Sequence, residues 1–188
     1  MKIGLFGGSF NPIHWAHLLY ASEACASLGL TKVIFIPSNF SPFKKKEETL
    51  EARHRYNMVR LAVKGDRRFA VSDIEIRRGG PSYTIETVRE LKRRMPRASL
   101  FFLIGSDCLP TLNRWKEAEE LFRLCRFVVA YRPGFRASPL SKKWLLLQIP
   151  ACDLSSRQIR GRARRRRPIT YCVPRTVEEY ILRHRLYR

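Results

Sequence analysis

The stretch that decides the fold is residues 4–18, GLFGGSFNPIHWAHL, which we call the N-terminal corner. Leu5 and Phe6 belong to an apolar run that predicts a short buried strand, and Gly7 and Gly8 follow it directly. Because these glycines carry no Cβ atom, we expect them to let the backbone turn sharply and approach a ligand. The corner therefore predicts a place where the chain backbone meets a bound molecule.

A helix is expected to open just after the glycines. Asn11 and Pro12 mark a turn, and residues 13–26 carry apolar side chains at helical spacing. The start of a helix presents unpaired N–H groups and the positive end of its dipole, so it favours an anion such as phosphate. His14 and His17 are three residues apart, and we expect both rings on one face of the first turn, where they reach the same anion.

A helix cap followed by a core histidine is the structural alternative for this pair. The functional interpretation is favoured because the two histidines coincide with the glycine turn and with a strand-to-helix junction. The corner matches neither G-x-G-x-x-G nor a P-loop, since no lysine–serine pair follows it.

The composition fits one globular unit of 188 residues with 45% hydrophobic residues. No apolar run is long enough to cross a membrane or to form a secretory signal, so a cytoplasmic protein is expected. The five cysteines are widely spaced and contain no C-x-x-C motif, so neither a disulfide framework nor a structural metal site is expected.

The net charge of +21 comes from 37 Lys and Arg against 16 Asp and Glu. It is concentrated in residues 44–46, 89–97 and 157–167. Such a field attracts polyanions, which leaves open nucleotides, nucleic acid or no specific partner.

Apolar strands alternate with helical segments along the chain, which predicts an α/β fold with a doubly wound, mainly parallel sheet and helices on both faces. The expected strands are residues 2–6, 32–37, 69–76, 100–104 and 126–130, with 144–149 as a sixth. Ligands of such sheets bind beyond the carboxyl ends of the strands, so we expect the loops after Gly7, Pro37 and Gly105 to meet. We expect residues 1–188 to form one domain, with the helical part from about residue 155 packed on it.

Two loops between these elements carry polar side chains. Residues 37–46, PSNFSPFKKK, place Lys44 in a loop that either closes over a phosphate or is a solvated basic loop. The helix expected at residues 52–63 places Arg53 near the cleft. Ser82 or Thr84 is expected to cap a helix at residues 85–94, whose free N–H groups form a second place for a carboxylate.

The carboxyl half adds an acid, an aromatic residue and an arginine at strand ends. Asp107 follows a buried strand, and by default it is an exposed loop carboxylate. Trp115 is by default a core aromatic residue, and Arg132 opens the turn Arg-Pro-Gly.

Residues 154–160, LSSRQIR, contain a helix-capping serine pair, Ser155 and Ser156. Arg160 lies one turn further, where its guanidinium can bind a phosphate held at the same helix start. The arginines at 162–167 are interpreted as a solvated basic face. An amphipathic helix at residues 174–186 is expected to pack beside the sheet.

The corner sequence GGSFNPIHWAH resembles the GxFxPxHxGH signature of the HxGH nucleotidyltransferases, with Ala16 in place of the family's second glycine. Over almost the whole chain, the motifs resemble the bacterial nicotinate-nucleotide adenylyltransferase family, which has a Rossmann-like fold. Phe43 and Arg157 stand where that family has histidine and threonine. The resemblance implies adenylyl transfer from ATP to nicotinate mononucleotide in NAD biosynthesis, with Mg²⁺ carried by the ATP.

The same resemblance assigns roles to individual residues. The ATP-binding set is Gly7, Gly8, Ser9, Phe10, His14, His17, Asp107, Ser156, Ile159 and Arg160. The set for the nicotinate nucleotide is Lys44, Tyr83, Thr84, Trp115 and Arg132. The catalytic set is His14, His17, Lys44 and Arg160, acting as cationic or hydrogen-bonding groups on the phosphates.

Two alternatives remain open at this stage. A related HxGH adenylyltransferase would act on nicotinamide mononucleotide or phosphopantetheine, and a basic nucleic-acid-binding protein would have no enzymatic activity. The sequence contains no RNA-binding motif or zinc knuckle that would support specific nucleic-acid binding. No membrane partner is expected, and a homo-oligomer is left open. All of these assignments depend on one expectation, that the N-terminal corner and residues 154–160 fold together around one triphosphate.

Overall fold

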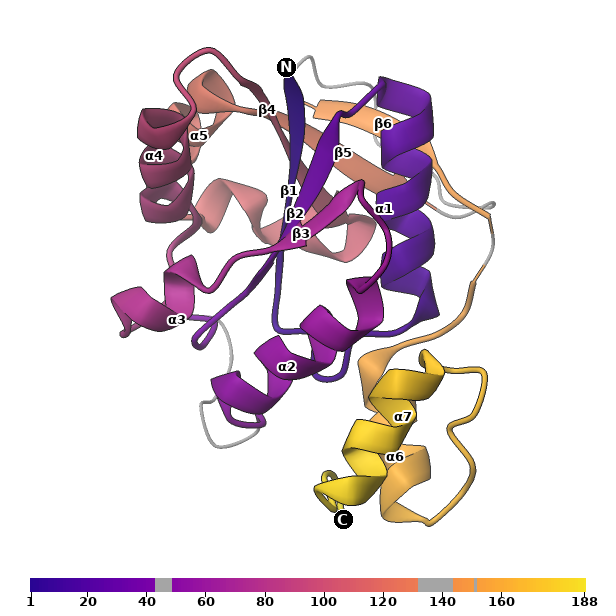
Figure 1. Ribbon diagram of the computed structural model, residues 1–188. Helices are drawn as coiled ribbons and strands as arrows, with labels where there is room; N and C mark the ends of the chain where they lie inside the picture. Colours follow the sequence, from indigo (N-terminus) through magenta and orange to yellow (C-terminus); the bar gives the residue numbers. More distant parts are fainter. Residues whose placement is uncertain (43–48, 132–143, 151) are drawn as a thin grey trace.

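The computed structural model describes residues 1–42, 49–131, 144–150 and 152–188. Its centre is a six-stranded sheet in the order β3-β2-β1-β4-β5-β6, and every neighbouring pair of strands is parallel (Figure 1). The strands are β1 Lys2–Gly8, β2 Lys32–Pro37, β3 Phe69–Val71, β4 Ser99–Gly105, β5 Arg126–Tyr131 and β6 Trp144–Gln148. This confirms the predicted doubly wound sheet, including its sixth strand.

Helices cover both faces of the sheet (Figure 1). They are α1 Trp15–Leu28, α2 Ala52–Val63, α3 Ile74–Arg78, α4 Thr84–Arg94, α5 Ala118–Leu124, α6 Ser156–Arg164 and α7 Arg175–Arg183, with a 3₁₀ segment, η2, at Ser106–Arg114. The strands are apolar on both sides because each face packs under helices. Leu5 belongs to the core beneath α4 and α5, whereas its neighbour Phe6 belongs to the core beneath α1 and α2.

The third strand is shorter than the sequence pattern predicts. Residues 69–76 were expected to form one strand, but β3 ends at Val71 and α3 begins at Ile74. The alternating apolar residues Ile74 and Ile76 suggested an extended chain. In the structure the N–H of Arg77 donates to the carbonyl of Asp73 at 2.8 Å, which closes a helical turn there.

The two carboxyl-terminal helices lie together at the end of the molecule towards which the strands run (Figure 1). The helix expected at residues 174–186 is α7, with Pro174 as its N-cap residue. It packs against α2 rather than directly beside the sheet: the Tyr180 hydroxyl accepts a hydrogen bond from Asn57 Nδ2 at 3.2 Å and lies 2.9 Å from His54 Nδ1. Buried side chains of α6 and α7, such as Ile159 and Val177, join the core that contains Phe6.

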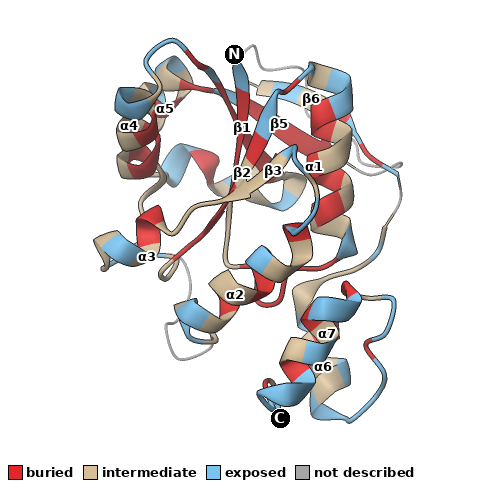
Figure 2. Ribbon diagram, viewed as in Figure 1, coloured by how far each residue is buried: buried red, intermediate tan, exposed pale blue. Residues whose placement is uncertain are grey.

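Most residues of these two helices are exposed or intermediate, and few are buried (Figure 2). Arg157, Arg162 and the four arginines at 164–167 are exposed, as expected for a solvated basic face. Among the described residues, no helix is long and apolar enough to cross a membrane.

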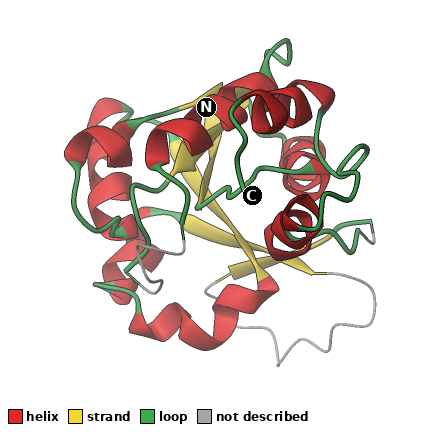
Figure 3. Cartoon of the chain, turned by 90° about the horizontal axis from the view of Figure 1, so that it is seen from below, coloured by secondary structure: helices red, strands yellow, loops and turns green. Residues whose placement is uncertain are grey.

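The strand order reverses between β1 and β4, because the chain builds outward to β2 and β3 on one side and to β5 and β6 on the other. In open sheets of this kind, ligands bind at the carboxyl ends of the strands beside this point. Figure 3 looks onto that edge from below. The part of the N-terminal corner after Gly8 follows β1, and Asp107 follows β4, so both lie at the switch point.

Candidate active site

Residues 154–160 and the N-terminal corner are in direct contact. Ser156 Oγ donates a hydrogen bond to the carbonyl of Pro12 at 2.8 Å, and Arg160 Nη1 donates to the carbonyl of Asn11, also at 2.8 Å. The Tyr187 hydroxyl donates to Asn11 Oδ1 at 2.8 Å. The expected meeting of these two distant segments is therefore confirmed.

The two histidines occupy different positions from those predicted. His14 is the N-cap residue of α1 with extended backbone, and His17 is the third residue of the helix. The rings still stack, with centroids 3.7 Å apart and an angle of 29° between the planes. The extended backbone of His14 brings its ring over that of His17, so the pair meets at the helix entrance rather than within the first turn.

A backbone hydrogen bond orients the His17 ring. The N–H of His14 donates to His17 Nδ1 at 3.2 Å. A ring nitrogen that accepts a hydrogen bond carries no proton, so the neutral ring holds its proton on Nε2. His17 therefore presents Nε2–H as a donor, which is the property that a phosphate oxygen requires.

The glycines of the corner act differently from the prediction. Gly7 and Gly8 remain in β1, and the left-handed residue of the turn is Phe10, with φ +44°. A Cβ atom on Gly7 would lie 3.0 Å from the ring of Phe102, and one on Gly8 would lie 3.3 Å from the ring of Phe10. The glycines make room for aromatic rings of the protein itself.

Phe10 packs its ring against the ring of His17. Its side chain is buried, and its ring lies edge-on to His17 with centroids 5.1 Å apart. Phe6 makes a similar contact with His17 at 5.8 Å. These aromatic rings hold the imidazole in place, so Phe10 contributes its side chain to the core.

The predicted cap of α6 is present. Ser155 is the N-cap residue: its Oγ accepts from the N–H of Gln158 at 3.3 Å, and its own N–H donates to Gln158 Oε1 at 2.8 Å. Because Ser155 caps the helix, the Ser156 hydroxyl can reach Pro12. Ile159 is fully buried in the core, and it fixes the face of α6 that carries Arg160.

Asp107 lies at the start of η2 and is exposed, which agrees with the default interpretation of a loop carboxylate. Its carboxylate folds back over Gly105 so closely that a Cβ atom on Gly105 would collide with it. Any larger residue at position 105 would therefore have to displace this carboxylate.

Tyr83 and Thr84 lie at the start of α4, as N-cap and first helical residue. The Lys116 ammonium lies 4.5 Å from the centre of the Tyr83 ring, a cation–π contact. Ser82 was expected as a cap, but its hydroxyl instead accepts a hydrogen bond from the N–H of Asn39 at 2.9 Å. This contact ties the start of α4 to the loop after β2.

Trp115 packs as a core aromatic residue. Its ring lies edge-on to Phe102 and to Phe127, with centroids 6.1 Å apart in each pair. The side chain is partly exposed, so a face towards a substrate stays a prediction. We call Tyr83, Thr84 and Trp115 the acceptor side, because the sequence predicts that they contact the nicotinate nucleotide.

Lys44 and Arg132 lie outside the described residues, as does Phe43. Within the described ranges, no group of three His, Cys, Asp or Glu side chains could hold a metal ion.

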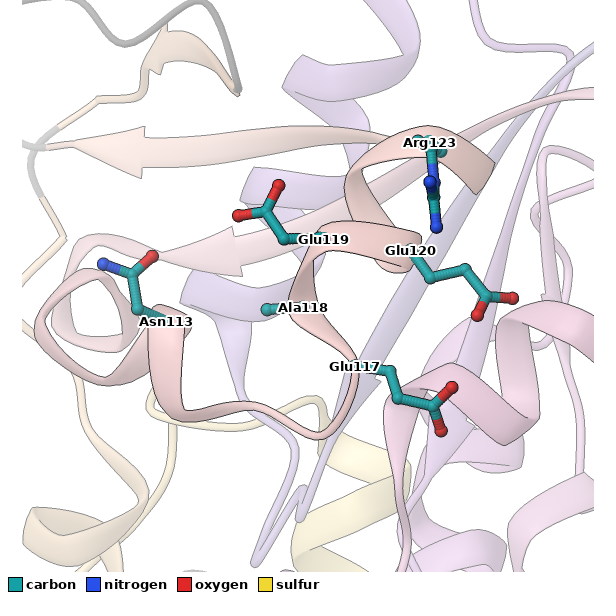
Figure 4. Close-up of a pocket in the computed structure, with 6 residues that line it drawn as sticks. All are labelled: Asn113, Glu117, Ala118, Glu119, Glu120 and Arg123. Carbon is teal, nitrogen blue, oxygen red and sulfur yellow. The ribbon is translucent and has the colours of Figure 1, made fainter.

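A cavity of about 400 Å³ lies elsewhere, at the start of α5 (Figure 4). It is lined by Asn113, Glu117, Ala118, Glu119, Glu120 and Arg123. None of the predicted site residues lines it. Three glutamates would repel a nucleotide, and two of them, Glu117 and Glu120, already pair with Arg89.

Two residues of this region were not predicted from the sequence, Arg55 and Tyr187. Arg53 was expected near the cleft but is exposed, whereas Arg55 is buried on the apolar face of α2 with Met58 and Val59. A charged residue in an apolar stripe is a signal that the sequence carries. Tyr187 gave no such signal, because its hydrogen bond to Asn11 depends on the tertiary fold.

The fold and the corner together define a nucleotidyltransferase. A cytidylyltransferase-like family model matches residues 5–162. A Thermus thermophilus protein named "Probable nicotinate-nucleotide adenylyltransferase" is 44% identical over the whole of both chains, and a Corynebacterium kroppenstedtii protein of the same name is 40% identical over 99% of this chain and 90% of its own. The chain belongs to the nicotinate-nucleotide adenylyltransferase family.

A solved structure shares the fold at lower sequence identity. The Plasmodium falciparum nicotinic acid mononucleotide adenylyltransferase complexed with NaAD superimposes with a TM-score of 0.82, at 21% identity, over 99% of this chain and 97% of that one. The Rossmann-like nucleotidyltransferase fold expected from the sequence is thereby confirmed.

Proposed function

We infer that this chain transfers the adenylyl group of ATP to nicotinate mononucleotide, giving nicotinate adenine dinucleotide and pyrophosphate, a step of NAD biosynthesis. The names of its relatives support this reaction. The observation that carries the proposal is the pair of hydrogen bonds that Ser156 and Arg160 donate to the carbonyls of Pro12 and Asn11. This contact brings a serine, an arginine and a histidine pair to one helix entrance.

In this reaction a phosphate oxygen of the mononucleotide attacks the α-phosphorus of ATP. The bond from that phosphorus to the bridging oxygen breaks, and pyrophosphate leaves with the bonding electrons. Negative charge grows on the nonbridging and leaving oxygens, so preorganised donors lower the barrier. His17 offers Nε2–H as one such donor.

We assign the polyphosphate of ATP to His14, His17, Ser156, Arg160 and Lys44, and its nucleoside to Asp107. The pyridine nucleotide is assigned to Tyr83, Thr84, Trp115 and Arg132. Arg160 Nη1 donates to the Asn11 carbonyl, so the guanidinium, a planar group that matches phosphate, is held at the N-terminal corner. The ATP is expected to enter as its Mg²⁺ complex, so the metal is part of the substrate. We place the reaction in the cytoplasm.

The test supplies ATP and Mg²⁺ with nicotinate mononucleotide, nicotinamide mononucleotide or phosphopantetheine, and measures pyrophosphate for each acceptor. We expect release with nicotinate mononucleotide above the other two. Preference for another acceptor would reassign the substrate within the superfamily. Release with none, together with steeply salt-dependent RNA binding, would favour the nucleic-acid-binding alternative that the charge of +21 motivates.

A further inference from the structure

Arg55 is a buried cation close to the candidate site. Its side chain is only 1% exposed, and it lies on the face of α2 that also buries Met58 and Val59. Removing a guanidinium from water is unfavourable unless hydrogen bonds replace the lost hydration. Burial lowers the pKa of Arg55 to about 10, so the side chain still carries its charge at neutral pH. A buried charge of this kind needs an explanation.

Three backbone carbonyls surround the guanidinium. Nε donates to Leu50 at 2.6 Å, Nη1 to Ser9 at 2.8 Å, and Nη2 to Asn39 at 2.6 Å. The planar fork of arginine directs these donors in fixed directions, and hydrogen bonds from a charged donor are stronger than neutral ones. Arg55 therefore fixes the relative positions of three separate segments of backbone.

Two of these segments, those at Ser9 and Asn39, contact different parts of the candidate site. Ser9 precedes Phe10, whose ring supports His17. Asn39 follows β2, and its N–H and its side-chain amide donate to Ser82 Oγ and the Gly80 carbonyl, both at 2.9 Å. Through Asn39, Arg55 connects the N-terminal corner to the start of α4.

We propose that Arg55 is a positioning residue of adenylyl transfer, which holds the Ser9 and Asn39 carbonyls together and so aligns the ATP corner with the acceptor side. The proposal rests on the proposed function. Misalignment of two reactants by about 1 Å can cost about a hundredfold in rate. The effect should therefore appear in kcat, while ATP alone still binds to Ser156 and Arg160, neither of which provides one of the three carbonyls that Arg55 binds.

The test compares Arg55→Lys, Arg55→Gln and the matched control Arg60→Met with the wild type. Lysine keeps the charge but has no planar fork, and glutamine leaves no buried charge. Arg60 is an exposed arginine of the same helix. We measure thermal unfolding, and kcat and KM for both substrates on folded protein. We expect kcat to fall by about 30-fold or more in both Arg55 variants, with KM for ATP within about threefold of the wild type and Arg60→Met unchanged.

Hydrogen exchange provides a readout that does not depend on the reaction. In Arg55→Lys we expect faster exchange in peptides that cover residues 9–10 and 39–40, with peptides of β4 unchanged. Wild-type kcat in folded variants would overturn the proposal, and so would failure of both variants to fold, because the role would then be purely structural. If the wild type releases no pyrophosphate, the proposed function fails instead, whatever the exchange data show.

Discussion

The N-terminal corner and the acceptor side are built in different ways. In the corner, Ser156 and Arg160 donate to the Pro12 and Asn11 carbonyls, and the His17 ring is oriented by a backbone N–H. On the acceptor side, Tyr83 lies under Lys116, and Trp115 packs on the core. Ser156, Arg160 and His17 thus make directional hydrogen bonds to backbone groups, whereas the Tyr83 and Trp115 side chains make ring contacts. We therefore expect mutations in the corner to lower the rate and mutations on the acceptor side to change substrate affinity.

The largest effect is expected for His17→Ala. Loss of one donor to a developing negative charge costs about 3 kcal/mol, so kcat should fall at least about a hundredfold while the fold is retained. The measurement is steady-state pyrophosphate release, with circular dichroism to check folding.

His17→Gln sharpens this test, because a glutamine amide nitrogen can take the place of Nε2 and restore part of the rate. His184→Ala changes an exposed histidine of the carboxyl-terminal segment and serves as the control. Wild-type turnover in folded His17→Ala would remove this side chain from the chemistry.

Arg160→Ala is expected to have the next largest effect. A hydrogen bond to a charged group contributes about 1.5–3 kcal/mol, so kcat/KM for ATP should fall by about 10- to 100-fold. Arg157→Ala is the matched control, because Arg157 lies on the same helix and is exposed. An equal loss in both variants would show that the general charge of α6 matters, and not the contact of Arg160 with the corner.

Tyr83→Ala tests the acceptor side. We expect KM for nicotinate mononucleotide to rise by about fivefold, in line with about 1 kcal/mol for a ring contact, while KM for ATP stays the same. Tyr56→Ala is the matched control, because the ring of Tyr56 on α2 also faces a cation: the guanidinium carbon of Arg60 lies 5.9 Å from its centre. A change in KM for ATP of the same size would contradict the separation of the two regions.

The smallest effect concerns stability. Glu75 is buried beneath the start of α4, where it accepts a hydrogen bond from Thr87 Oγ1 at 2.7 Å, and burial raises its pKa. As pH rises above the ordinary range of a glutamate, the unfolded state releases its proton first, so the folded state loses stability until the raised pKa is passed.

We expect Glu75→Gln to flatten this part of the stability–pH curve, measured by urea unfolding from pH 4 upward. Glu179→Gln, at an exposed position of α7, should keep the slope of the wild type. An unchanged slope in Glu75→Gln would show that another group is responsible.

The sequence was sufficient for the sheet, for the capping serine of α6 and for the contact between the two ends of the chain. The sheet and the cap depend on local patterns, namely apolar runs and a serine pair, whereas the contact between the two ends was expected from the family resemblance. The sharp turn at Gly7 and Gly8 was predicted wrongly, because both residues stay in β1, while their contact with ATP stays a prediction. The space beside them is filled by Phe102 and Phe10, and no local pattern names such distant partners. The charge of Arg55 within an apolar stripe was a local signal that the prediction overlooked, but its three acceptors could not be predicted, since they are backbone atoms of other segments.

The closing contacts of the corner span great distances along the chain. Ser156, Arg160 and Tyr187 reach back over 144, 149 and 176 residues to the Asn11–Pro12 turn. Closing loops of this length carries a larger entropic cost than forming any single hairpin or helix, and contacts between distant residues form late in folding. A growing polypeptide can therefore form these contacts only after its carboxyl-terminal segment has been synthesised.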